Sequence, residues 1–377
     1  MEVSRKTFLL ISVITLITCI SCMTSCENIT YLRWKSPEQI LAGMSLEEKV
    51  YQMFFVAPES ITPEIGQAVM AGETTKNAMD NHPVGGIIYF EQNIIDKEQI
   101  EEMLKNVKSF SKITPFLGVD EEGGRVARLG NNGLVTQYPP MKEIGDTNDT
   151  QKAKEIGETL GNELCALGFN VDFAPVADVL FDTESSEIGD RSFGADASLV
   201  SQMVSNEVYG LHTGGVSAVL KHFPGHGSVK TNSHEGYAES DKTLEELKNC
   251  DFLPFKAGID AGADFVLISH AAYVNAAGEC PASLSKEIIS WLKDGMGFDG
   301  IVITDSFCMG AIADNYTAEE AAVEAVYAGV DMILMPADLE ESANALIGAV
   351  KDGRISEERI NESVLKILSV KRNRGLI

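Results

Sequence analysis

The sequence Ile301-Val302-Ile303-Thr304-Asp305 joins a short, almost entirely apolar run to a carboxylate that follows it directly. Runs of this kind are typical of strands that are buried on both faces, as in parallel sheets. Seven further runs have the same character, and in chain order the eight are 52–57, 84–90, 114–119, 171–179, 217–223, 265–269, 300–304 and 331–335. The chain therefore predicts eight buried strands.

Helical patterns separate these runs. Apolar residues recur with a 3.6-residue period most clearly over 96–110, 151–167, 244–261, 318–328 and 356–372. Eight strands that alternate with helices predict an α/β fold, a (β/α)8 TIM barrel. The pattern alone leaves an open, doubly wound parallel sheet as the alternative. No stretch rich in Pro, Ser or Gly divides the chain, so we expect a single catalytic domain and a monomer.

The charge balance excludes one broad class of function. The 377 residues include 30 Lys and Arg against 56 Asp and Glu, a formal net charge of −26. Proteins that bind nucleic acids generally need clustered Lys and Arg to contact phosphates, so we expect no nucleic-acid partner. Hydrophobic residues make up 44% of the chain, which is enough to bury a core.

The N-terminus has the pattern of an export signal. Arg5 and Lys6 precede an uncharged apolar run over 8–20, which is too short to cross a bilayer comfortably and suits a signal peptide. Small residues precede Cys22 and Cys26, as at the processing site of bacterial lipoproteins. We expect a lipid anchor at Cys22, with processing at Cys26, plain secretion or a retained membrane anchor as alternatives.

This pattern fixes an expected layout and location. Residues 1–21 form a lipoprotein-type signal peptide, 22–37 a polar leader, and 38–377 the (β/α)8 catalytic domain. The protein is then exported, either as a lipoprotein on the outer face of the cell membrane or as a secreted protein.

The remaining cysteines give no sign of a disulfide framework or a zinc site. None of them has C-x-x-C spacing, and each lies in an apolar or helical stretch. They are Cys165, Cys250, Cys280 and Cys308. We expect free, buried thiols.

Polar residues follow most of the predicted strands. In chain order they are Glu91, Gln92, Asp120, Glu121, Glu122, Asp178, Lys221, His222, His270, Asp305 and Asp338. In a barrel the carboxyl ends of the strands meet on one face, where active sites lie. A carboxylate directly after a buried strand is costly unless it is used, so we interpret Asp305 as functional, with a structural cap as the alternative.

The segment 118–129, GVDEEGGRVARL, is the first of two informative motifs. Its paired glycines allow a close backbone approach after a strand. Asp120, Arg125 and Arg128 would place a carboxylate and two guanidiniums together, which suits the hydroxyls of a sugar. A structural Asp–Arg pair that stiffens the loop is the alternative.

The second motif begins at residue 221 with KHFPGHG and continues to His234. Three histidines in fourteen residues suggest a metal site, but His222 ends a strand while His226 and His234 lie on a loop, so the helical spacing of metal ligands is missing. We expect no metal. The long polar loop over 225–242 resembles a lid, and histidine is well suited to general acid/base catalysis near neutral pH.

Four motifs in this order resemble those of glycoside hydrolase family 3. They are GVDEEGGRVARL at 118–129, RSFG at 191–194, KHFPGHG at 221–227 with a later Ser-His, and ITDSFCMGAI at 303–312. The resemblance runs from about Ser45 to the C-terminus and is strongest to the family's single-domain β-N-acetylglucosaminidase (β-N-acetylhexosaminidase) branch.

The resemblance implies a retaining exo-enzyme that removes terminal β-linked N-acetylhexosamine through a glycosyl-aspartate intermediate, with no cofactor. Together with export, it implies cell-wall fragments of the muropeptide type as substrates. Position by position, Asp305 matches the nucleophile and His234 the acid/base. The residues that match the sugar-holding set are Asp120, Arg128, Arg191, Lys221 and His222.

One position departs from the branch. Its members show Asp-Ser-His, whereas this chain has Asn232-Ser233-His234. An amide can accept a hydrogen bond from the imidazole but carries no charge, so we expect a lower histidine pKa and a weaker base. Another carboxylate can take the place of the aspartate, and the candidates are Glu235, Asp178 and Asp190. A slow enzyme, a sugar-binding lipoprotein without catalysis and a β-glucosidase of the same family are also compatible with the sequence.

Overall fold

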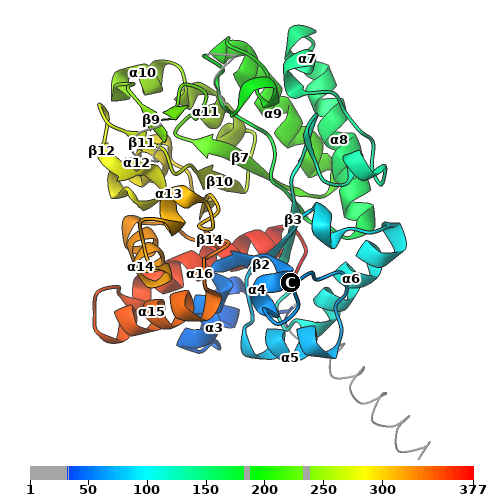
Figure 1. Cartoon of the computed structure of the whole chain (residues 1–377), viewed down its shortest axis with the longest axis vertical. Helices are drawn as coiled ribbons and strands as arrows, with labels where there is room; N and C mark the ends of the chain where they lie inside the picture. Colours follow the sequence, from blue (N-terminus) through cyan, green and yellow to red (C-terminus); the bar gives the residue numbers. More distant parts are fainter. Residues whose placement is uncertain (1–31, 33, 182–186, 232–237) are drawn as a thin grey trace, which may run out of the picture.

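The computed structural model describes residues 32, 34–181, 187–231 and 238–377. Its central sheet has eight parallel strands, in chain order β1 (Phe54–Val56), β2 (Gly86–Tyr89), β3 (Phe116–Val119), β6 (Val171–Asp172), β7 (Ser217–Phe223), β10 (Phe265–Ile268), β13 (Ile301–Thr304) and β14 (Ile333–Leu334). Strand β1 pairs with β14, and a parallel bridge between Ile303 and Met332 joins β13 to the start of β14. The ring is therefore closed, and the predicted (β/α)8 barrel is confirmed (Figure 1).

Aromatic rings fill the inside of the barrel. Strands β1, β3 and β10 are not neighbours in the sheet, yet their rings meet, so the contacts must cross the interior. The contacting rings are Phe55, Phe116, Phe173 and Phe265, with centroids 5.0 to 6.4 Å apart. Gly86 makes room for them, because a Cβ there would lie 2.5 Å from the Phe55 ring. The interior is thus a packed core, and open space is left only at its ends.

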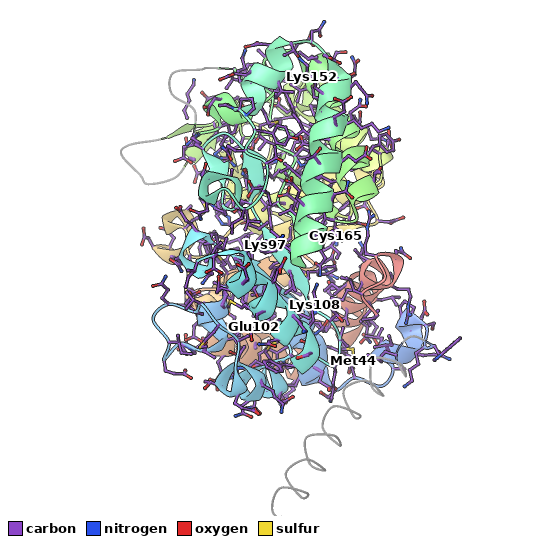
Figure 2. The ribbon with its side chains drawn as sticks, turned by 90° about the vertical axis from the view of Figure 1, so that its right-hand side faces the viewer. Met44, Lys97, Glu102, Lys108, Lys152 and Cys165 are labelled. Carbon is purple, nitrogen blue, oxygen red and sulfur yellow. The ribbon has the colours of Figure 1, made fainter. Side chains whose placement is uncertain are left out.

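Helices surround the barrel (Figure 1). In chain order they are α2 (Pro37–Leu41), α3 (Leu46–Gln52), α4 (Pro58–Ile61), α5 (Glu73–Asn81), α6 (Lys97–Phe110), α7 (Met141–Asp146), α8 (Thr150–Leu167), α9 (Ala197–Gly214), α10 (Leu244–Asn249), α11 (Phe252–Asp260), α12 (Lys286–Ser290), α13 (Gly310–Ala313), α14 (Ala318–Ala328), α15 (Leu339–Lys351) and α16 (Glu357–Asn373). Figure 2 shows α6 and α8 on the outer side of the barrel, where Lys108 Nζ donates to the carbonyl of Gly168, 2.5 Å away.

Four of the five predicted helices agree with α6, α8, α14 and α16 to within a residue at each end. The fifth, over 244–261, is wrong as a continuous helix, since the chain breaks between α10 and α11. Cys250 has φ −138° and ψ −73°, which is not helical. Pro254 explains the break, because it has no N–H for the carbonyl of Cys250 and its ring would clash with that carbonyl.

The expected lid over 225–242 is partly ordered as strands. β8 (Lys230–Thr231) and β9 (Ala238–Ser240) pair antiparallel, and β9 also pairs with β11 (Ala272–Tyr273). With β12 (Gly278–Pro281) they form a small four-stranded sheet. A second hairpin, β4 (Glu121–Gly123) with β5 (Val126–Ala127), follows β3. Residues 232–237, which include Asn232 and His234, lie outside the described residues, as does Cys22.

The four cysteines that follow the leader are free, as predicted. The expectation that they are buried is wrong for Cys165, Cys280 and Cys308, which are exposed. Cys165 is on an outer helix, Cys280 is on strand β12 at the edge of the small sheet, and Cys308 is in the turn after β13. Within the described ranges, no helix has the length and apolar character needed to span a membrane.

Asp331 anchors the end of the barrel that lies opposite the carboxyl ends of the strands. It is fully buried just before β14, and it accepts hydrogen bonds from Ser363 Oγ (2.7 Å) and the Val302 N–H (3.2 Å). Its ion-pair partners are Lys293 (3.1 Å), Arg359 (3.1 Å) and Lys366 (3.7 Å). At this face of a barrel such a cluster serves stability rather than catalysis.

We expect Asp331→Asn to lower the free energy of unfolding by about 3–5 kcal/mol, because it leaves buried cations without a countercharge. Urea unfolding measures the change. Asp352→Asn is the matched control: Asp352 is exposed and pairs only with Arg354, so the unfolding midpoint should not move. Equal midpoints for the two variants would contradict the assignment.

Candidate active site

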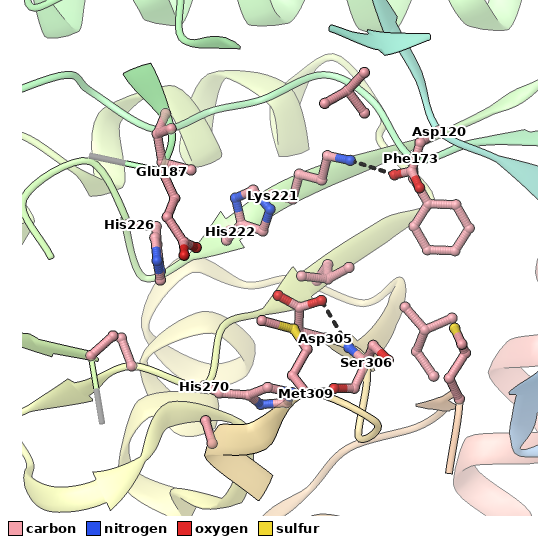
Figure 3. Close-up of a pocket in the computed structure, with 18 of the residues that line it drawn as sticks. Asp120, Phe173, Glu187, Lys221, His222, His226, His270, Asp305, Ser306 and Met309 are labelled. Atoms are coloured by element: carbon pink, nitrogen blue, oxygen red, sulfur yellow. Dashed lines mark hydrogen bonds and ion pairs between the residues drawn. The ribbon is translucent and has the colours of Figure 1, made fainter. Parts of the chain in front are cut away.

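A cavity of about 520 Å³ opens at the carboxyl ends of the barrel strands (Figure 3). Asp120 directly follows β3, Lys221 and His222 lie near the carboxyl end of β7, and Asp305 directly follows β13. His270 lines the same cavity two residues after β10. Because all these strands are parallel, their ends bring side chains that are far apart in the sequence onto one face.

Three cations and two carboxylates alternate on one wall of the cavity. Lys221 Nζ lies 2.8 Å from Asp120 Oδ1 and 2.5 Å from Glu122 Oε1. Arg191 binds Glu122 through two hydrogen bonds, from Nε to Oε2 (2.8 Å) and from Nη2 to Oε1 (2.7 Å). Arg128 Nη2 lies 3.7 Å from Asp120 Oδ2. The wall can therefore donate and accept hydrogen bonds at adjacent positions, as the hydroxyls of a sugar require.

The buried members of this wall stay charged at neutral pH. Burial alone would raise the pKa of Glu122, but Lys221 and Arg191 together lower it to about 2. Burial likewise opposes the charge of Lys221, yet Asp120 and Glu122 hold the lysine pKa above its ordinary value. Fixed charges of both signs thus face the cavity in a site where only 2–3% of the Glu122 and Lys221 side chains is exposed.

His222 is held by a buried aspartate. Its Nδ1 lies 2.8 Å from Asp178 Oδ2, and the same carboxylate accepts the backbone N–H groups of His222 (3.2 Å) and His226 (2.6 Å). Because a carboxylate only accepts, Nδ1 carries the proton, and Nε2 is left to accept from Arg191 Nη2 at 3.4 Å. Burial raises the pKa of Asp178, but the neighbouring His222 lowers it, and the pKa of Asp178 lies below its ordinary value.

Asp305 presents a carboxylate oxygen to the cavity. Its N–H donates to the Ile268 carbonyl (2.8 Å), and its Oδ1 accepts the N–H of Ser306 (2.8 Å). Among the described residues, Oδ2 has no hydrogen-bond partner, and Figure 3 shows the carboxylate facing the open space. Burial raises the pKa of Asp305, but His270, His222 and the Ser306 N–H outweigh it, so the pKa lies below the ordinary value. The group is therefore an ionised carboxylate with one oxygen open to the cavity.

His270 fixes the turn that carries Asp305. Its Nε2 lies 2.9 Å from the Ser306 carbonyl oxygen, and its Nδ1 lies 2.8 Å from Ser283 Oγ. A carbonyl only accepts, so Nε2 bears the proton and Nδ1 accepts from the serine hydroxyl. Burial lowers the pKa of His270, which keeps the ring neutral at neutral pH.

Six of the predicted site residues line this one cavity: Asp120, Arg128, Arg191, Lys221, His222 and Asp305. The predicted His234 and Asn232 lie outside the described residues. Among the described residues, no group of three or more His, Cys, Asp or Glu is placed to hold a metal ion. The sequence motifs assign no role to Glu122. Its place in the Glu-Glu-Gly-Gly stretch that directly follows β3 is the feature of the sequence that points to it.

Some predicted neighbours are not brought together. Arg125 does not join Asp120; it pairs with Asp190 at 3.3 Å, because the turn between β4 and β5 carries it outward. The oxygens of Asp178 are occupied by His222 and His226, and Asp190 is paired with Arg125. Glu91 and Gln92 are exposed and outside the cavity lining. Asp338 caps α15 by accepting the N–H of Glu341 at 2.8 Å.

The model of the glycosyl hydrolase family 3 N terminal domain matches residues 45–370. The chain is 31% identical over 348 residues to the β-hexosaminidase LpqI of Mycobacterium tuberculosis, covering 89% of this chain and 85% of that protein. It is 30% identical over 323 residues to β-hexosaminidase A of Pseudoalteromonas piscicida, covering 78% of this chain. The chain spans only about half of that relative's length, 54%.

Solved structures give the same picture. A glycoside hydrolase family 3 β-N-acetylglucosaminidase from a Paenibacillus species superposes with a TM-score of 0.81 at 33% identity, covering 89% of this chain and 63% of that one. The M. tuberculosis LpqI structure superposes with a TM-score of 0.78 at 30% identity, covering 88% of this chain and 95% of that one.

Proposed function

Since the chain belongs to glycosyl hydrolase family 3, we propose that it is a retaining exo-β-N-acetylglucosaminidase that removes terminal β-linked N-acetylhexosamine. The observation that carries the proposal is the ionised Asp305 carboxylate, with a free oxygen, beside the wall of Lys221, Arg191 and Asp120. The names of the similar proteins, β-hexosaminidase and β-N-acetylglucosaminidase, support the choice of an amino sugar.

In the first step, Asp305 Oδ2 attacks the anomeric carbon while the bond from that carbon to the leaving oxygen breaks. His234, assigned by its motif, gives a proton to the departing oxygen. The product of this step is a glycosyl ester of Asp305. In the second step, His234 takes a proton from water, the water oxygen attacks the same carbon, and Asp305 leaves. Two inversions give net retention of configuration.

The cation and carboxylate wall positions the terminal sugar. Asp120 can accept from a hydroxyl while Lys221 and Arg191 donate to its neighbours, and Arg128 and His222 extend the same surface. These groups are already held by one another, so they lose little freedom when substrate binds. The reaction needs no metal or organic cofactor, because a carboxylate and an imidazole supply the nucleophile and the proton transfers.

The role of His234 has a leaving-group signature. We expect His234→Ala to lower kcat/KM for N,N′-diacetylchitobiose by about 10³-fold, because a sugar oxygen must be protonated as it departs. With the 4-nitrophenyl glycoside the loss should be about tenfold or less, because nitrophenolate leaves without help. Steady-state kinetics on both substrates measure the difference, and equal losses would contradict an acid role.

Asn232→Asp should raise the rate at which the disaccharide is hydrolysed, because a carboxylate beside the imidazole raises the pKa of His234.

Two alternatives compete with this proposal. Asn232 stands where members of the branch have the aspartate of Asp-Ser-His, and this favours an impaired, sugar-binding lipoprotein that would bind amino sugars without turnover. A β-glucosidase of the same family would prefer substrates without the N-acetyl group. Comparing turnover of aryl β-N-acetylglucosaminide and aryl β-glucoside separates all three.

Export and lipid attachment at Cys22 complete the proposal. A lipid at that position would hold the barrel at the outer face of the membrane without any basic surface, which fits a net charge of −26. Cell-wall fragments of the muropeptide type are the substrates that such a location offers.

A further inference from the structure

The charged residues of the cavity divide into two groups. In the inner part, where the side chains are buried or half-buried, the cations Arg128, Arg191 and Lys221 are matched by three acids, Asp120, Glu122 and Asp305. At the exposed mouth lie two more acids, Glu187 and Asp314, and no cation lines this part among the described residues. Counted over the described lining residues, the inner part is therefore balanced, whereas the mouth carries an excess charge of −2.

The leaving group occupies the mouth. An exo-enzyme holds the terminal sugar at the closed end of the cavity, and here that end is formed by side chains that are almost fully buried, Lys221 and Glu122. The bond to be cleaved lies beside Asp305, so the rest of the substrate must extend toward solvent. Figure 3 shows the Glu187 carboxylate beside His226, pointing into the cavity on the side that Asp305 faces, and Glu187 is exposed.

Neither mouth acid is neutralised within the described residues. Among the residues that the structure describes, neither the side chain of Glu187 nor that of Asp314 forms an ion pair. Arg125 donates to the backbone carbonyl of Glu187, but its charge is matched by Asp190 at 3.3 Å. Lys230, which follows the lining residue Val229, pairs with Asp241 at 3.6 Å.

An apolar contact is available beside the acids. Met309 lines the mouth, and 42% of it is exposed. A sugar ring presents C–H groups on its faces, which can pack on such a side chain. The mouth thus offers acidic oxygens and one apolar surface to the leaving group.

We propose that the mouth of the cavity selects against leaving groups with a carboxylate near the cleaved bond and favours a neutral or cationic hexosamine there. The inference rests on the proposed function and narrows it. Cell-wall fragments fit this preference when the sugar after the cleaved bond is an N-acetylmuramic acid whose lactyl carboxylate is masked, for example as an amide.

Four disaccharides test this selectivity. Each has a terminal β-1,4-linked N-acetylglucosamine, joined to N-acetylglucosamine (neutral), glucosamine (cationic), N-acetylmuramic acid (anionic) or the methyl ester of that acid. The ester keeps the bulk of the lactyl group and removes its charge. We expect kcat/KM for the ester to exceed that for the acid by about five- to tenfold at low ionic strength, with the gap closing to about twofold near 0.5 M salt.

The double variant Glu187→Gln/Asp314→Asn separates charge from shape. Its ratio of ester to acid should fall to near one, whatever happens to its absolute rates. Glu358→Gln is the matched control. Glu358 is exposed at the start of α16, next in sequence to Arg359, which pairs with Asp331 at the other end of the barrel. Its ratio should equal that of the unaltered protein.

The two hypotheses fail in different ways. If the unaltered protein hydrolyses the acid and the ester at the same rate, the proposed selectivity against a carboxylate is overturned. The proposed function is then unaffected. If none of the four is hydrolysed, the proposed function fails, and titration calorimetry with the same compounds then decides the selectivity. In that case a weaker affinity for the acid supports it, and equal affinities for acid and ester overturn it.

Discussion

Replacing Asp305 by alanine is expected to lower kcat/KM for an aryl β-N-acetylglucosaminide by about 10⁴-fold or more, because it removes the group that forms the covalent bond. The fold should survive, since the Asp305 side chain makes one hydrogen bond, to the Ser306 N–H, and no ion pair among the described residues. Nitrophenol release measures the rate, and circular dichroism with thermal unfolding checks the fold. Activity fully retained in the variant would contradict the mechanism.

A small anion provides the control for this variant. The truncated side chain leaves space where azide can attack the anomeric carbon from the side that Asp305 would use. One inversion then occurs in place of two, so the product should be the α-glycosyl azide. If azide does not restore activity to the Asp305→Ala variant, and the variant binds N-acetylglucosamine as tightly as the unaltered protein, the sugar-binding alternative is favoured.

With the aryl glycoside, Glu122→Gln is expected to have the second largest effect, a loss of about 10²-fold in kcat/KM. Glu122 accepts two hydrogen bonds from Arg191 and contacts Lys221 at 2.5 Å. A glutamine can offer one acceptor, and its amide would point two donors toward cations. Both cations would then shift by enough to misplace the sugar. Steady-state kinetics measure the loss, and Glu91→Gln, an exposed acid outside the cavity, is the control.

The same variant should change the dependence of stability on pH. Its neighbours lower the Glu122 pKa from 4.5 to about 2, so the unfolded chain takes up this proton first as the pH falls. The carboxylate therefore contributes stability that is fully present above pH 5 and is lost between about pH 4.5 and 2, on the order of 3 kcal/mol. Acid unfolding curves of the Gln variant should lack this component. Parallel curves for the two proteins would contradict the pairing.

The strand pattern made the barrel predictable. Strands that are buried on both faces must be apolar throughout, and β13 with its following Asp305 is the clearest case. Eight such strands with intervening helices leave two folds, a closed barrel and an open doubly wound sheet, and the pairing of β1 with β14 decides for the barrel. The small sheet formed by β8, β9, β11 and β12 was not predictable in the same way, since its strands are as short as two residues and partly exposed.

The site was predictable at strand ends and much less so beyond them. Asp305, Lys221 and His222 follow from their positions, because parallel strands bring such positions together. The pairing of Asp178 with His222 joins residues 44 positions apart, and Glu122 with Arg191 joins residues 69 apart. Which carboxylate meets which cation depends on the path of the loops, and the local sequence does not determine that path. Arg125 shows the consequence, because its turn carries it away from Asp120.

Trapping the glycosyl-enzyme intermediate tests the central claim most directly. A 5-fluoro N-acetylglucosaminyl fluoride forms the ester readily and releases it slowly, because the ring fluorine destabilises the charge that develops in both steps. Peptide mapping by mass spectrometry then locates the sugar. The proposed mechanism predicts one sugar per chain, attached to the peptide that contains Asp305. A sugar attached to any other residue, or no covalent adduct from an enzyme that hydrolyses the substrate with inversion, would contradict it.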